Sequence, residues 1–151
     1  MGIEYKGLSS ITLLCNHIEE TYRFYVEVCE IGTGTKTKNE NGELTGASVT
    51  LTSGQTINLV AKEYSSCNKT KERSFHHFCL EVDDYCKAIR DFQQRGVTVY
   101  ETIVDFNIVC EEPIEQYGPG QCGSYCAFIR DPEGNDIELQ YFTKNSKQVT
   151  C

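Results

Sequence analysis

Apolar and polar residues alternate along residues 8–15, which predicts a β-strand with one apolar face. Asn16 follows as a plausible N-cap, and apolar residues then recur at helical spacing over residues 18–29. We expect this helix to end before Gly32, because glycine commonly follows the last helical residue. The chain therefore opens with a strand and a helix.

A turn-rich stretch and two further strands complete the first half. Residues 32–46 are rich in Gly, Thr, Lys and Asn, and Asn41-Gly42 is their best turn signal. The pattern predicts strands at residues 47–52 and 55–61. Residues 62–74 are polar and basic, so we interpret them as a linker.

The second half repeats this order. Residues 75–82 predict a strand, and a helix follows that Asp83 or Asp84 caps and Gly96 stops. A short strand is predicted at residues 97–101, and a long segment then leads to the last two strands.

The chain closes with a predicted hairpin. Apolar runs at residues 125–129 and 137–142 flank the turn Asp131-Pro-Glu-Gly-Asn135. Pro132 presets φ for the first corner, and Gly134 supplies a positive φ that other residues resist. In the last strand, apolar residues alternate with polar ones, so one face carries a carboxylate. A carboxylate on the inner side of a sheet needs an explanation.

The two halves align with each other. A shift of 67 residues lays Ser10 on His77, and a shift of 80 lays Asn58 on Glu138, residues 102–122 absorbing the difference. Each half reads as a βαβββ unit, in which one helix covers one face of a small sheet. Two such units side by side can close a curved sheet around a shared groove.

Composition limits the possible partners. The chain has 151 residues, 39% of them hydrophobic, which suits one compact domain or two half-domains that share a core. Its net charge of −8 argues against nucleic acid or an anionic membrane as partner and is compatible with a cationic ligand. We find no apolar run of the kind that a signal peptide or membrane span requires, so we expect a cytoplasmic protein.

The nine cysteines are odd in number and contain no Cys-x-x-Cys pair, so we expect reduced thiols. Cys122-x-x-x-Cys126 is the one close pair, and it is weak as a metal site without a second pair. Several others lie inside apolar segments, where a thiol packs like a small hydrophobic group; these are Cys15, Cys29, Cys79 and Cys126.

Three motifs resemble a known family. His77-Phe-Cys-Leu-Glu-Val-Asp-Asp84, Asp131-Pro-Glu-Gly-Asn-Asp-Ile-Glu138 and Ile18-Glu-Glu-Thr-Tyr-Arg-Phe-Tyr25 resemble the glyoxalase/bleomycin-resistance/extradiol-dioxygenase superfamily, the vicinal oxygen chelate fold. The resemblance covers about residues 7–143.

The resemblance implies an α+β glyoxalase-like fold. Two paired βαβββ modules, at about residues 7–61 and 75–142, would be joined by the linker 62–74 and form a curved sheet around a cleft. Together they would make a single domain over residues 1–151. Members of such families often cover open sheet edges with a second chain, so we also expect a homodimer.

The resemblance also implies four positions for a divalent metal. Carried over residue by residue, they fall on Ser10, Asn58, His77 and Glu138. Imidazole and carboxylate are good ligands for zinc, nickel, iron or manganese, whereas a serine hydroxyl and an amide oxygen are poor ones. Cys79 lies two residues beyond His77 on the same strand face and could supply a substitute thiolate. We therefore expect no cofactor, or one weakly bound zinc or nickel ion.

Individual residues leave alternatives open. His77 could be a metal ligand, an acid/base group or a structural histidine. Glu138 could be a ligand, a catalytic base or an anchor for a cationic or hydroxylated molecule, or it could bond to Ser10, Asn58 or Gln140 and only hold the groove in shape. Glu81 shares this face at a strand end. Phe24 and Tyr25 are assigned to the core.

Three functions fit these features. The first is a protein that binds a small molecule in its groove without a complete metal site, through Ser10, Asn58, His77, Cys79 and Gln140, with Glu138 as the reactive or anchoring carboxylate. The second is a metal-dependent lyase, isomerase or epimerase of the glyoxalase I type. The third is a non-catalytic structural or regulatory protein with a vestigial site.

Overall fold

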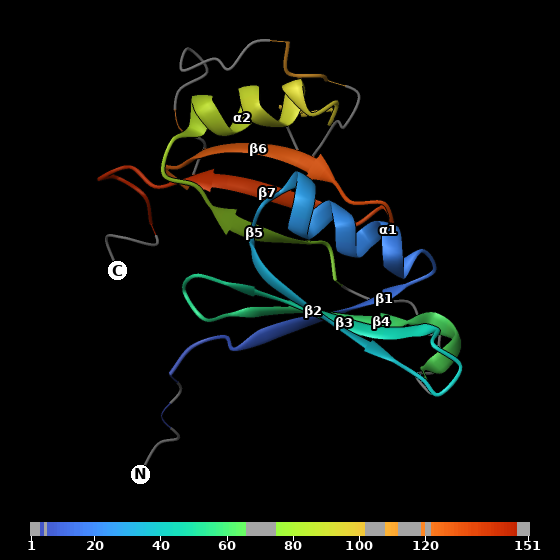
Figure 1. The fold of residues 1–151 in the computed structure, drawn as a ribbon. Coiled ribbons are helices and arrows are strands. Elements are labelled where there is room, and N and C mark those ends of the chain that lie inside the picture. The colour runs from blue at the N-terminus through green and yellow to red at the C-terminus, as the bar shows by residue number, and fades with distance from the viewer. Residues whose placement is uncertain are drawn as a thin grey trace. The chain divides into compact units, whose positions relative to one another are not determined.

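The computed structural model describes residues 4, 6–65, 75–101, 108–111, 119 and 122–147. The chain divides into two compact units, Met1–Lys71 and Glu72–Cys151, each with its own small sheet (Figure 1). The mixed α+β class is therefore confirmed. The single domain and the pairing of the two modules around a cleft stay predictions, and most of residues 66–74 and 102–121 lie outside the described residues.

The first unit has the order strand, helix and three strands. Its elements are β1 (Ser10–Cys15), α1 (Ile18–Arg23), the π-helical turn η1 (Phe24–Val28), β2 (Gly32–Lys38), β3 (Leu44–Leu51), β4 (Thr56–Ala61) and the 3-10 turn η2 (Lys62–Tyr64). The sheet order is β1-β4-β3-β2, with β1 parallel to β4 and the other neighbours antiparallel. The predicted strands at residues 8–15, 47–52 and 55–61 are thus present with shifted ends.

Three details of the first unit differ from the prediction. Residues 32–46 contain the strand β2, because its Gly and Thr residues find a complete antiparallel partner in β3 despite their turn-like composition. The N-cap of α1 is His17 rather than Asn16, and no side chain caps it. The helical segment ends before Gly32 as predicted, but from Phe24 to Val28 it is the π-helical η1 rather than α-helix. The Asn41-Gly42 turn is present, with Gly42 at φ 81°.

The second unit has the smaller sheet, with three strands. It contains β5 (His77–Glu81), α2 (Tyr85–Gln94), β6 (Tyr125–Arg130) and β7 (Asp136–Tyr141), with the sheet order β5-β7-β6. Asp84 caps α2 by accepting the backbone N–H of Lys87 at 2.9 Å, as predicted. The strand predicted at residues 97–101 is reduced to Tyr100, which bridges Phe128 and Val109.

The turn between β6 and β7 is built as the sequence indicates. Gly134 has φ 82°. The buried Asp131 accepts the backbone N–H groups of Glu133 and Asn135 at 3.0 and 2.8 Å, and the Asn135 side chain at 2.8 Å. These bonds fix where β7 begins and hence which of its residues face which way.

Matching registers show the internal repeat. In the first unit Thr12 lies opposite Asn58, and in the second Cys79 lies opposite Glu138. The shifts of 67 and 80 residues map the first pair onto the second. Each sheet therefore has the same parallel pair at its first edge.

Each sheet buries one apolar face. In the first unit this face packs against α1 and η1, where Phe24 and Tyr25 are buried as predicted. In the second it packs against α2, whose Ile89 and Phe92 are buried. The strand residues that form these cores are Leu13, Cys15, Ala47, Val49, Ile57, Leu59, Ala127, Ile129, Ile137 and Leu139. The opposite faces carry the polar residues.

Candidate functional site

The polar face of the second sheet gathers the chemically active side chains of that unit. Glu138 on β7 lies between Cys79 on β5 and Phe128 on β6, and Gln140 lies one row further, between Glu81 and Cys126. Because residues directly opposite each other in a sheet share a face, all of these side chains project on the side away from α2.

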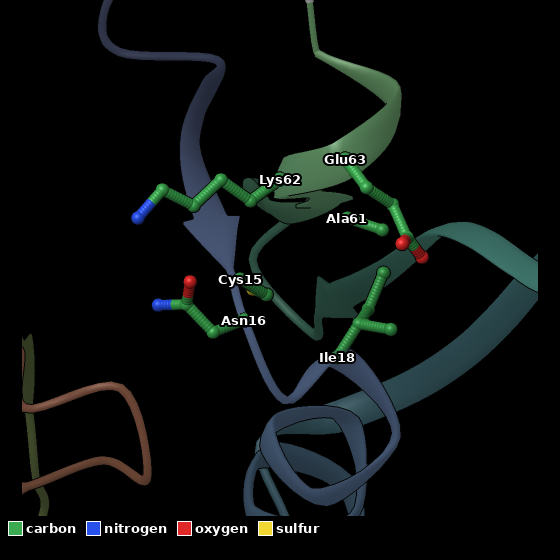
Figure 2. A pocket seen from close by; sticks show the side chains of 6 residues that line it. All are labelled: Cys15, Asn16, Ile18, Ala61, Lys62 and Glu63. Atoms are coloured by element: carbon green, nitrogen blue, oxygen red, sulfur yellow. The ribbon is translucent and has the colours of Figure 1, made fainter. Parts of the chain in front are cut away.

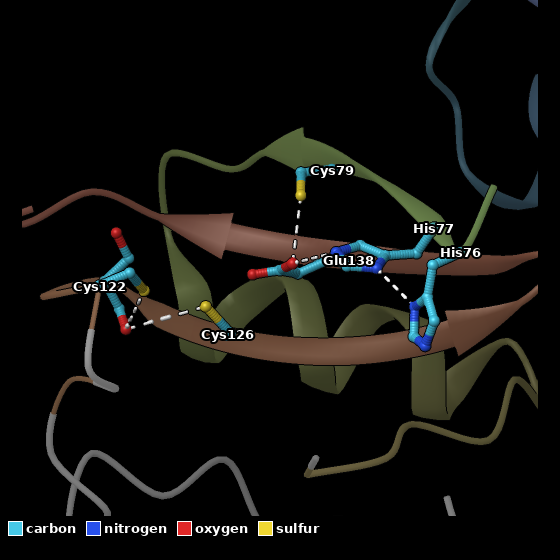
Figure 3. Close-up of polar contacts among 7 residues, drawn as sticks. His76, His77, Cys79, Cys122, Cys126 and Glu138 are labelled. Atoms are coloured by element: carbon cyan, nitrogen blue, oxygen red, sulfur yellow. Dashed lines mark hydrogen bonds and ion pairs between the residues drawn. The ribbon is translucent and has the colours of Figure 1, made fainter. Parts of the chain in front are cut away.

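Glu138 is the centre of this face. Glu138 is only 9% exposed to solvent. Its Oε2 atom lies 2.9 Å from His77 Nε2 and accepts the Cys79 thiol at 3.1 Å (Figure 3). A buried carboxylate needs such partners, because desolvation of the charge would otherwise be costly.

Both ring nitrogens of His77 lie within hydrogen-bond distance of a neighbouring side chain. Its Nδ1 lies 2.9 Å from His76 Nδ1, and its ring meets Phe128 edge to face at 6.2 Å. The arrangement is satisfied when His77 donates from Nε2 to Glu138 and accepts at Nδ1 from His76. His77 is thus oriented by its neighbours, and part of its ring stays accessible.

The three thiols on this side of the sheet differ in acidity. Burial, and then the hydrogen bond to Glu138, raise the pKa of Cys79 to about 12. Burial and a hydrogen bond to Glu138 also raise the pKa of Cys126. Burial opposes ionisation of Cys122 as well, but hydrogen bonds with Ser124 and Cys126 outweigh it and lower the pKa of that thiol.

The sequence prediction missed the proximity of Cys126 to Glu138. Pairing the two hairpin strands would have revealed it, because Cys126 is the register partner of Gln140. Cys79 also differs from the prediction, since it is exposed rather than packed in an apolar segment. Its strand alternates, and position 79 falls on the polar face.

Ser10 and Asn58 belong to the first unit. Asn58 lies between Thr12 and Ser48, and its Oδ1 accepts the Ser48 hydroxyl at 2.8 Å. Ser10 stands on the same face, two residues before Thr12. The second unit brings His77, Cys79 and Glu138 together; their convergence with Ser10 and Asn58 stays a prediction. Glu138 bonds to His77 and Cys79 among the described residues, and Glu81 is exposed.

The donors of the second unit have the chemistry of a metal site. Nε2 of His77, Sγ of Cys79 and a carboxylate oxygen of Glu138 all lie within 4.8 Å of one another. Nitrogen, thiolate and carboxylate in this number match the protein ligands of a catalytic zinc ion. The residues present therefore fit a borderline divalent cation, with Cys79 in a role that the family's four positions do not include.

The first unit contains an open pocket of about 360 Å³ (Figure 2). It lies where β1 and β4 end and α1 begins. Its lining residues are Cys15, Asn16, Ile18, Ala61, Lys62 and Glu63. None of these is a predicted site residue, and no charged side chain in it is buried.

Comparison with solved structures places the chain among glyoxalase-like folds. TnmS3, an antibiotic binding protein from Streptomyces sp. CB03234, aligns with a TM-score of 0.65 and 19% identity over 94% of this chain and 100% of that one. A lactoylglutathione lyase from Agrobacterium tumefaciens gives 0.60 and 18% over 91% and 94%. A protein from the mobile metagenome of V. pseudocholerae gives 0.64 and 20% over 95% and 100%.

Two further findings complete the comparison. No curated protein matches this chain. Among the described residues, no helix has both the length and the apolar character that crossing a membrane requires. The model of the Glyoxalase/Bleomycin resistance protein/Dioxygenase superfamily matches residues 7–139, and the chain belongs to that superfamily.

Proposed function

We propose that this protein binds a small organic molecule, with Glu138 as the anchoring carboxylate, and that it does so without the family's complete metal site. Ser10, Asn58, His77, Cys79 and Gln140 are the proposed ligand contacts. The observation that carries the proposal is the state of Glu138: a buried carboxylate, oriented by His77 and Cys79, on the face opposite the helix.

The chemistry of this face favours a cationic or aromatic ligand. Glu138 brings negative charge, and the chain as a whole carries −8. The partly exposed ring of His77 offers an aromatic surface beside the carboxylate. A cationic group could therefore pair with Glu138 while its apolar part stacks on this ring. The likeness to TnmS3, described as an antibiotic binding protein, agrees with a small organic ligand.

The four metal positions of the family support the metal-free form of the proposal. Ser10 offers only a hydroxyl, and the amide oxygen of Asn58 is already an acceptor for Ser48. Neither is a strong ligand for a transition metal.

Calorimetric titration with metal-free bleomycin as a cationic probe tests the proposal. Binding to the wild-type protein should weaken by about tenfold or more in Glu138→Gln, which corresponds to the loss of one charged interaction. Glu81→Gln is the matched control, because Glu81 is an exposed carboxylate on the same face, and it should bind nearly as well as wild type. Equal affinity of all three proteins would exclude Glu138 as the anchor.

A second candidate is a divalent-metal-dependent lyase, isomerase or epimerase of the glyoxalase I type. The closeness of His77, Cys79 and Glu138 favours it. These three residues would hold the ion, which would supply a Lewis acid for a carbonyl or enediolate oxygen. His76 would then keep the His77 ring in place through its Nδ1 contact. Measuring lyase activity on a hemithioacetal, with zinc or nickel added, separates the two candidates.

We further propose a cytoplasmic homodimer. Among the described residues, the outer edge of β2 in the first unit has no neighbouring strand, and a second copy would cover such an edge. Light scattering across a range of concentrations checks this assembly, and a monomer at every concentration would refute it.

A further inference from the structure

The thiols of Cys122 and Cys126 both point toward one backbone carbonyl beside the second sheet. Their Sγ atoms lie 4.0 and 3.8 Å from the carbonyl oxygen of Ser124 (Figure 3). Both residues are partly exposed. Two accessible sulfur atoms that share one acceptor are close enough for a single reagent to involve both.

The bend that brings them together is fixed by the rest of the unit. Gly123 has φ 79°, and a Cβ atom there would lie 2.2 Å from the carbonyl oxygen of Asn145. The carbonyl of Gly123 accepts the hydroxyls of Thr143 and Ser146 at 2.6 and 3.2 Å. The backbone between the two cysteines is therefore clamped on the segment that follows β7, so their approach is built into the fold.

We propose that Cys122 and Cys126 form an oxidisable dithiol, a modification site at which a hydroperoxide converts the two thiols into an intrachain disulfide. Cys122 is the attacking thiol and Cys126 the resolving thiol. The site lies within the second unit and uses residues that the proposed ligand contacts do not include.

The assignment of roles has a physical reason. The lowered pKa of Cys122, which its hydrogen bonds with Ser124 and Cys126 cause against the effect of burial, increases the thiolate fraction near neutral pH. The thiolate is the form that attacks a peroxide. Cys126 is the thiol nearest along the chain and shares the Ser124 carbonyl, so it is placed to react next.

The reaction balances in two steps. Sγ of Cys122 attacks one peroxide oxygen, the O–O bond breaks, and the leaving oxygen takes up a proton, which leaves a sulfenic acid on Cys122. Sγ of Cys126 then attacks Sγ of Cys122, the S–O bond breaks, and water departs with the proton of the Cys126 thiol. Two thiols have lost two electrons to the peroxide, and a small thiol such as glutathione can reverse the change.

Oxidation of the two thiols would also change the surroundings of Glu138. Burial, and then the nearness of this carboxylate, raise the pKa of the Cys126 thiol, whereas a disulfide has no ionisable proton. Oxidation would thus change one neighbour of Glu138 and leave its contacts with His77 and Cys79 in place. Any effect on ligand affinity rests on the proposed function, whereas disulfide formation does not.

Chymotryptic mapping of the full-length protein tests the proposal. The reduced protein is treated with hydrogen peroxide, its remaining thiols are alkylated, and it is cleaved after Tyr125, which lies between the two cysteines. We expect the peptides on either side of Tyr125 to stay joined until a reductant is added. Separate peptides after oxidation would overturn the proposal.

Variants assign the two roles. Cys126→Ser should accumulate a sulfenic acid on Cys122 that dimedone traps, and Cys122→Ser should form no disulfide at Cys126. Cys86→Ser, a partly buried thiol on α2, is the control and should oxidise as wild type does. A disulfide between Cys126 and Cys79 of equal yield in Cys122→Ser would refute the roles. If a serine variant does not fold, dimedone labelling of the wild type at short times still decides whether Cys122 reacts first.

Discussion

His77 Nε2 lies 2.9 Å from Glu138 Oε2, and this contact joins the edge strand β5 to the central strand β7 of the second sheet. The two residues stand one row apart in register, with Cys79 opposite the carboxylate. The contact thus ties the chemistry of the polar face to the pairing of the strands.

The first prediction concerns this pair. His77→Ala and Glu138→Gln should each lower the free energy of unfolding, and the double variant should lose less than the sum, with a coupling of about 1 kcal/mol because the contact is largely shielded from water. Urea denaturation of the four proteins measures the cycle. Additive losses would mean that the contact contributes nothing in solution.

The second prediction concerns metal. Zinc or nickel should shift the thermal midpoint only slightly, because the gain grows with the logarithm of metal concentration over the dissociation constant and we expect weak binding. Calorimetry on the wild type and on His77→Ala provides the measurement. Tight stoichiometric binding that disappears in His77→Ala would instead show that the site is complete, through Cys79 or a second chain, and would favour the lyase candidate.

The third prediction concerns the reactivity of thiols. Although Cys79 is exposed, burial of its sulfur and the bond to Glu138 raise its pKa to about 12, so it stays protonated near neutral pH. Iodoacetamide at neutral pH should therefore label Cys122 before Cys79, and the labelling of Cys79 should accelerate as the pH rises toward 12. Mass spectrometry at short times shows the order, and unfolding in urea should abolish the difference.

Much of the fold was predictable from sequence because its signals are local. Alternation, the Asp84 cap and the Asp131–Asn135 turn each depend on neighbouring residues, and the resemblance to the superfamily assigned His77 and Glu138 to one site. The strand β2 was not, because glycine and threonine become a strand only when β3 supplies the partner. The same holds for the cluster of thiols near Glu138, since the position of Cys122 depends on a bend that distant residues clamp.

The fourth prediction concerns the turn that sets the register of β7. Asp131→Ala should destabilise the protein by about 1–3 kcal/mol, because it leaves donors of Glu133 and Asn135 without their buried acceptor. Asp131→Asn should cost less, since its amide oxygen can replace Oδ1 for the two backbone N–H groups. Chemical denaturation compares the two, and an equal loss in both would show that the negative charge matters more than the acceptor geometry.

The last prediction concerns Gly123 and uses Gly96 as its control. Both have positive φ, 79° and 77°, so an alanine at either position should cost about 1 kcal/mol in backbone strain. A Cβ atom at Gly96 meets nothing within 4 Å, whereas at Gly123 it would lie 2.2 Å from the carbonyl oxygen of Asn145. Gly123→Ala must therefore also push the chain off the segment 143–147. We expect it to lose clearly more stability than Gly96→Ala in urea denaturation, and to form the Cys122–Cys126 disulfide more slowly because the bend between the two thiols opens. Equal stability of the two variants would mean that the segment at Asn145 moves aside at no cost. The closeness of the two cysteines would then depend on the local chain alone.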